Sequence, residues 1–103
     1  MQKLVRDKIT DIIQQSGKQC RWETVSHEEY LRLLDEKLQE ELMEYEESHS
    51  LEELADLLEV MRAIVQVRGW SLEELEQLRV DKAIQRGGFD GKILLKEVED
   101  YHA

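Results

Sequence analysis

Two pairs of carboxylates stand three residues apart in the middle of the chain, Glu41 with Glu44 and Glu53 with Asp56. Residues at positions i and i+3 share one face of an α-helix, so each pair can direct its oxygens to one place. Four hard oxygen donors suit Mg²⁺ or Mn²⁺, whereas zinc favours His and Cys. If two neighbouring helices carry the pairs, the spacing predicts a divalent-cation site between them.

Helix start signals divide the chain around these carboxylates. Ser26, Ser50 and Ser71 are each followed three residues later by Glu, the pattern of a capping box, in which the Ser oxygen accepts from a free backbone N–H. The pattern predicts helices at about 27–47, 51–68 and 72–85. The segment that links the first two of these helices, Tyr45 to Ser50, is too short for anything but a turn, so they should form an antiparallel hairpin.

The remaining segments are predicted with less detail. A first helix is expected at about 3–15, ending before Gly17. Residues 18–25 are interpreted as an extended connection or a short strand. Gly87 is expected to end the last main helix, and the apolar residues of 89–103 could pack as a strand or as a short helix.

Helical geometry places the first carboxylate pair beside the core. The apolar stripe of the 27–47 helix is Leu31, Leu34, Leu38, Leu42 and Tyr45. At about 100° per residue, Glu41 lies about 60° from the centre of this stripe and Glu44 about 120° from it on the same side. Glu41 is therefore predicted at the margin of the buried face. Glu40 falls away from the core, as a surface residue would.

The 51–68 helix has two apolar faces. One apolar stripe is formed by Leu51, Leu54, Leu58, Met61 and Val65. The other face begins with Glu53 and Asp56 and continues with Val60, Ala63, Ile64 and Val67. A helix that is apolar nearly all round is buried on both sides, which a chain of 103 residues achieves most readily as a homodimer or homotetramer.

The negative charge of the protein is concentrated around this site. Residues 35–60 contain eleven acids and one base, which accounts for the whole net charge of −10. Buried carboxylates need a partner, and in a window so poor in Lys and Arg a metal ion is the favoured one. The same charge disfavours binding of nucleic-acid polymers. An acidic solvated surface is the alternative, and it would make the protein a non-catalytic helical interaction module that docks a basic partner.

Several classes of protein are disfavoured by what the sequence lacks. It has no apolar run long enough to span a membrane. Charged residues interrupt the N-terminal segment, whereas a signal peptide contains an uninterrupted apolar region. Cys20 has no partner for an internal disulfide, which fits the reducing cytoplasm. The three histidines, His27, His49 and His102, are too scattered for a zinc site. We therefore expect a cytoplasmic protein without a membrane anchor.

The acidic motif resembles that of a known superfamily. Glu40-Glu41-Leu42-Met43-Glu44 followed by Glu53-Leu54-Ala55-Asp56 resembles the E-E-x-x-E and E-x-x-D signature of the all-α nucleoside triphosphate pyrophosphohydrolases, the MazG-like superfamily. Three blocks are similar to a small phosphoribosyl-ATP pyrophosphohydrolase-like branch: Lys3–Ile9, the central Lys37–Glu41 with Glu53–Asp56, and Lys82 with Arg86–Phe89. The resemblance spans almost the whole chain and implies one domain over residues 1–103.

The resemblance implies an activity and roles for particular residues. In that superfamily Mg²⁺ grips a triphosphate, and water attacks the α–β linkage to give a nucleoside monophosphate and pyrophosphate. Glu41, Glu44, Glu53 and Asp56 would be the metal ligands, and Glu40 or one of those four, such as Glu41, would orient or deprotonate the water. The nucleotide stays open, between a non-standard triphosphate and phosphoribosyl-ATP or another nucleotide conjugate.

Phosphate oxygens would also need positive side chains to hold them. The candidates are Lys3, Arg6, Lys8, Lys82 and Arg86. In fold class, the sequence predicts an all-α helical bundle with a central antiparallel helix hairpin, completed by homo-oligomerisation.

Overall fold

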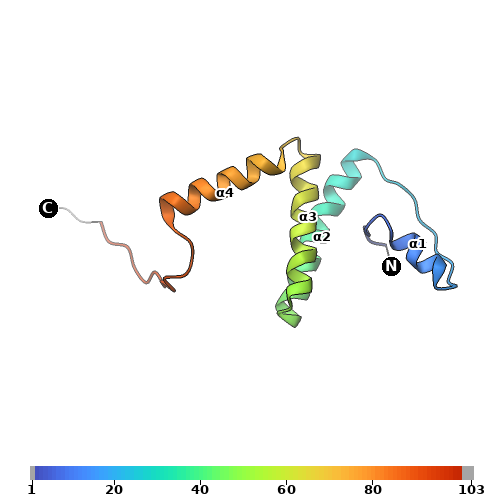
Figure 1. Cartoon of the computed structure of the whole chain (residues 1–103), viewed down its shortest axis with the longest axis horizontal. Helices are drawn as coiled ribbons and strands as arrows, with labels where there is room; N and C mark the ends of the chain where they lie inside the picture. The colour runs from blue at the N-terminus through green and yellow to red at the C-terminus, as the bar shows by residue number, and fades with distance from the viewer. Residues whose placement is uncertain (1, 101–103) are drawn as a thin grey trace. The chain divides into compact units, whose positions relative to one another are not determined.

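The computed structural model of the chain describes residues 2–100, which form four helices and no strand. The helices are α1 (Ile9–Gln15), α2 (His27–Ser48), α3 (Leu51–Val67) and α4 (Leu72–Arg86) (Figure 1). The prediction of an all-α protein is confirmed. The chain divides into two compact units, Met1–Leu72 and Glu73–Ala103, so that the carboxylate pairs lie in the first and most of α4 lies in the second.

The helix starts lie where the serines predicted them. Ser26 Oγ accepts the backbone N–H of Glu29 at 3.2 Å, and Ser50 Oγ accepts the backbone N–H of Glu53 at 3.3 Å. Each serine thus satisfies one of the N–H groups that a helix start leaves without a partner inside the helix. α4 begins directly after Ser71, as expected.

Only His49 and Ser50 separate α2 from α3. His49 adopts a left-handed conformation with φ of 52°, and its N–H donates to the carbonyl of Tyr45 at 2.7 Å. This conformation ends α2, and the cap formed by Ser50 starts α3 immediately. α2 and α3 then pack against each other extensively, side by side in Figure 1, with Leu34 of α2 and Val60 of α3 buried.

The face of α3 that packs against α2 is the one that begins with Glu53 and Asp56. Val60 is buried and the rest of its face is half-buried, whereas Leu51 is 82 % exposed and Leu58 is 53 % exposed. The apolar continuation of the carboxylate face predicted its burial, whereas burial of the Leu51 stripe by a second copy of the chain stays a prediction. The consequence for the site is direct, since Glu53 and Asp56 lie on the face that meets α2.

The first helix is shorter than predicted, because it begins at Ile9 and not near Lys3. No side chain caps its start at Lys8, and residues 2–6 have no regular structure. A short isolated helix is only marginally stable in water. Residues 2–6 do not extend α1, and Lys3 and Arg6 instead form ion pairs with residues of α2 and α3. The helix ends before Gly17 as expected, with Gly17 at a φ of 90°.

The second unit consists of the rest of α4 and the segment after it. Gly87 ends α4 as predicted, with a φ of 83° and an N–H that donates to Ala83 at 2.8 Å. Residues 92–100 form neither of the two expected structures, strand or helix, and Ile93 and Val98 are largely exposed. Residues 18–25 are also without a strand. The end of the 89–103 segment, with His102, lies outside the described residues.

None of the helices within residues 2–100 combines the length and the apolar character that crossing a bilayer requires.

Candidate metal centre

Glu41 is the one charged residue in the described part of the chain that is buried, with 6 % of its surface exposed. The sequence placed it at the margin of the core of α2. The structure places it deeper, because α3 packs over that margin with the face that carries Glu53 and Asp56. Burial of a carboxylate is costly unless another group compensates its charge.

Two groups of carboxylates share Glu41. Carboxylate oxygens of Glu41, Glu53 and Asp56 lie within 4.8 Å of one another, and so do those of Glu40, Glu41 and Glu44. Opposite oxygens around Mg²⁺ are about 4.2 Å apart, given bonds of about 2.1 Å. Each group could therefore hold a metal ion after a small adjustment of side chains. The four residues predicted as ligands all belong to these two groups.

Unsatisfied oxygens distinguish these groups from an ordinary acidic surface. Glu41 Oε2 and Glu53 Oε2 are buried, and neither has a hydrogen-bond partner. A buried polar atom without a partner carries its full cost of desolvation. The side chains of the two residues come from different helices, α2 and α3, and a cation between them would satisfy both oxygens.

The pKa values of the two residues reflect this environment. Burial raises the pKa of the Glu41 carboxyl, with Lys37 opposing the shift and Glu44 adding to it. Burial also raises the pKa of Glu53, and the negative charges of Glu44, Asp56 and Glu41 add to the rise. Both carboxyls thus release their proton less readily than an ordinary glutamate unless a cation compensates their charge.

Two basic residues already compensate part of this charge. Lys37 Nζ lies 3.3 Å from Glu41 Oε1 and 3.4 Å from Glu40 Oε2, and Arg6 Nη2 lies 2.6 Å from Asp56 Oδ1. The preference for a metal ion over a basic partner rested on the bases of residues 35–60 alone, whereas Arg6 reaches Asp56 from fifty positions away. Lys37 was not among the predicted site residues, although its i, i+4 spacing to Glu41 signals the contact.

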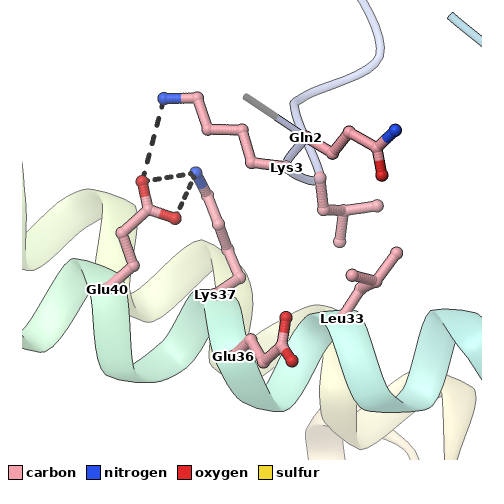
Figure 2. A pocket seen from close by; sticks show the side chains of 7 residues that line it. Gln2, Lys3, Leu33, Glu36, Lys37 and Glu40 are labelled. Carbon is pink, nitrogen blue, oxygen red and sulfur yellow. Dashed lines mark hydrogen bonds and ion pairs between the residues drawn. The ribbon is translucent and has the colours of Figure 1, made fainter.

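Glu40 lies beside a small pocket and is half-buried, although its position on the helix predicted a surface residue. The pocket has a volume of about 100 Å³ and is lined by Gln2, Lys3, Leu4, Leu33, Glu36, Lys37 and Glu40. Figure 2 shows the ammonium groups of Lys3 and Lys37 both directed at the Glu40 carboxylate, Lys3 from 3.8 Å. The pocket is smaller than the roughly 300 Å³ at which small-molecule sites begin, so a nucleotide does not fit within it.

The other predicted phosphate-binding residues are Lys8, Lys82 and Arg86. Lys8 is exposed just before α1 and pairs with none of the described acids. Lys82 and Arg86 are exposed residues of α4, in the second unit. Of the three candidates in the first unit, Lys3 and Arg6 contact the carboxylate groups. The role of Lys8, Lys82 and Arg86 stays a prediction.

Comparison with known proteins finds no relative. No protein-family model matches the chain. Neither the curated proteins nor the solved structures contain a match. The resemblance to the MazG-like superfamily therefore rests on the residues quoted above and stays a prediction.

Proposed function

We propose that this protein is a Mg²⁺-dependent nucleoside triphosphate pyrophosphohydrolase that releases a nucleoside monophosphate and pyrophosphate. The observation that carries the proposal is the buried Glu41 carboxylate, whose Oε2 has no partner and whose neighbours are Glu53 and Asp56. This donor set consists of carboxylate oxygens, which Mg²⁺ prefers and which Mn²⁺ accepts. The E-E-x-x-E and E-x-x-D pattern of the sequence supports the choice of reaction.

In this proposal the carboxylates have separate tasks. Glu41, Glu44, Glu53 and Asp56 would hold Mg²⁺, which when bound supplies a Lewis acid for the phosphate oxygens and lowers the pKa of water. Glu40 would orient the attacking water and accept its proton. Its side chain is 34 % exposed and so remains within reach of solvent. Lys37 would limit the repulsion between Glu40 and Glu41, since it contacts both.

The polyphosphate would need basic groups beside the metal. Lys3 and Arg6 are the first candidates, because each forms an ion pair with a carboxylate of one of the two groups. Their charge would offset the repulsion between a polyphosphate and the acidic segment. We assign Lys8, Lys82 and Arg86 to the same task on the sequence pattern alone.

We also propose that α2 and α3 form an antiparallel hairpin and that a second copy of the chain covers its outer face. The two-residue link and the packing between the helices support the hairpin. The stripe of Leu51, Leu54, Leu58 and Met61 supports the assembly, since these side chains are 40–82 % exposed. Exposed apolar stripes of this length commonly mark protein interfaces. Either a homodimer or a homotetramer would cover this stripe.

A nucleotide panel tests the reaction. Standard triphosphates, non-standard triphosphates and phosphoribosyl-ATP are incubated with the full chain and Mg²⁺, and both pyrophosphate and monophosphate are measured. The proposal expects both products in equal amounts from at least one nucleotide, and none in the presence of EDTA. Release of orthophosphate in place of pyrophosphate would contradict the assigned cleavage site.

One observation favours a different function. Arg6 and Lys37 already neutralise part of the carboxylate charge, as they would in an acidic helical module that docks a basic partner and catalyses nothing. Such a module would show no metal-dependent product with any nucleotide of the panel. Preference for phosphoribosyl-ATP within the panel would keep the reaction class and change only the substrate.

A further inference from the structure

The ion pair between Arg6 and Asp56 joins the N-terminal segment to one of the two carboxylate groups. Arg6 Nη2 lies 2.6 Å from Asp56 Oδ1, although residues 2–6 belong to no helix. Both side chains are accessible, that of Arg6 being 55 % exposed and that of Asp56 39 % exposed. Ion pairs with this exposure are weak, so the contact can open at little cost.

Arg6 pairs with a carboxylate that a cation at this site would need. Asp56 shares its group with Glu41 and Glu53, and the buried oxygens Glu41 Oε2 and Glu53 Oε2 have no partner. A divalent cation satisfying these oxygens would lie within a few ångströms of the guanidinium. Like charges at that distance repel each other, so Arg6 and the cation compete for Asp56.

Lys37 differs from Arg6 in this respect. It stands one turn before Glu41 on the same helix, and its side chain is only 16 % exposed. Its position is fixed by α2, whereas Arg6 lies on a segment without regular structure. Lys3, on the same segment, lies 3.8 Å from Glu40. The N-terminal segment thus holds the basic groups that are able to leave.

We propose that Arg6 is an exchangeable counter-ion of the carboxylate site. It pairs with Asp56 in the metal-free protein, leaves when a divalent cation binds, and then pairs with an anionic phosphate group that the cation recruits. The guanidinium suits both partners because it forms the same two-pronged hydrogen bonds with carboxylate and with phosphate. This inference rests on the metal centre of the proposed function and adds a coupling between metal and anion binding.

The first test measures metal alone. MnCl₂ is titrated by calorimetry into the full wild-type chain, into Arg6→Gln and into the control Arg68→Gln. Arg68 Nη2 lies 3.6 Å from Asp35 Oδ2, so the control also removes an exposed Arg–Asp pair and one positive charge from the first unit. We expect Arg6→Gln to bind Mn²⁺ about two- to fivefold more tightly than wild type, the range that loss of an exposed ion pair allows. Arg68→Gln should bind as wild type does.

The second test adds the anion. Inorganic pyrophosphate is titrated into each variant at saturating Mg²⁺, and Arg6→Gln is expected to bind it about fivefold or more weakly than wild type. Opposite changes in the two affinities support the exchange. Unchanged or weaker Mn²⁺ binding by Arg6→Gln would overturn it and leave the metal centre standing, as would unchanged pyrophosphate binding. Failure of wild type to bind either metal would remove both the exchange and the proposed function.

Discussion

Lys37 Nζ lies 3.3 Å from Glu41 Oε1, while the second oxygen of the same carboxylate, Oε2, is buried without a partner. One oxygen of Glu41 is thus held by a lysine of its own helix, and the same carboxylate lies in one group with Glu53 and Asp56 of α3. A half-satisfied buried carboxylate is costly for folding. A residue with this geometry is what a cation site needs.

Loss of a metal ligand should remove activity and leave the fold intact. Glu41→Gln and Asp56→Asn keep the size of each side chain and remove its charge, so Mg²⁺ loses a ligand. We expect pyrophosphate release to fall by about 100-fold or more, with unchanged helical circular dichroism. Glu46→Gln is the matched control, since Glu46 is an exposed acid of α2 outside both carboxylate groups. Full activity in both site variants would refute the assignment.

Neutralising Glu53 should stabilise the metal-free protein. Burial and three neighbouring carboxylates raise the pKa of Glu53, so the charged form is disfavoured in the folded state. Glu53→Gln keeps the backbone N–H that caps α3 and removes that charge. The Tm measured at neutral pH with EDTA should rise. Glu52→Gln removes a neighbouring exposed acid from the first turn of α3, where negative charge is favourable, and its Tm should stay the same or fall.

The same shift gives stability a characteristic dependence on pH. Folding raises the pKa of Glu53 above its ordinary value of 4.5. The contribution of this carboxyl to stability is therefore complete at a pH below 4.5 and is lost as the pH rises through the raised pKa. The Tm difference between Glu53→Gln and wild type should therefore grow as pH is increased from 4.5 to 7. A difference that shrinks over this range would show that the charged form of Glu53 is stabilised.

Lys37 should set the titration of Glu41. Its ammonium group opposes the rise in the pKa of Glu41 that burial causes. Removing it with Lys37→Gln should raise that pKa further, measured by NMR of the labelled Glu41 side chain in metal-free protein. Lys18→Gln removes an exposed lysine of the first unit and should leave the titration unchanged. An unchanged or lower pKa in Lys37→Gln would mean that the 3.3 Å contact is absent in solution.

A charge on the outer stripe of α3 should disrupt the proposed assembly. Leu58 is 53 % exposed, and a glutamate there would be desolvated if a second copy covers it. We expect wild type to be a dimer or tetramer by size-exclusion chromatography with light scattering, and Leu58→Glu to be smaller. Leu78→Glu, a similarly exposed leucine of α4, is the control and should match wild type. A wild-type monomer at micromolar concentration would contradict the assembly.

Local signals in the sequence predicted much of this structure. The serines before Glu29 and Glu53 located two helix starts, because capping depends on residues only three positions apart. Gly17 and Gly87 located two helix ends, since glycine adopts positive φ without steric cost. The position of Glu41 beside the core followed from the period of the helix alone.

Features that depend on distant residues could not be predicted in this way. The pairing of Arg6 with Asp56 spans fifty positions and has no local signal. The start of α1 at Ile9 also depends on distant residues. Contacts made by the segment before it, such as that of Lys3 with Glu40, replace the helical turn predicted for residues 3–8.

The most direct test of the central claim is a calorimetric titration of Mn²⁺ and of Mg²⁺ into the metal-free full chain, compared with Glu41→Gln and with Glu46→Gln. We expect saturable binding to wild type and to Glu46→Gln, and no measurable binding to Glu41→Gln. Absence of binding to wild type, or equal binding to all three proteins, would show that the oxygens around Glu41 do not form a metal centre.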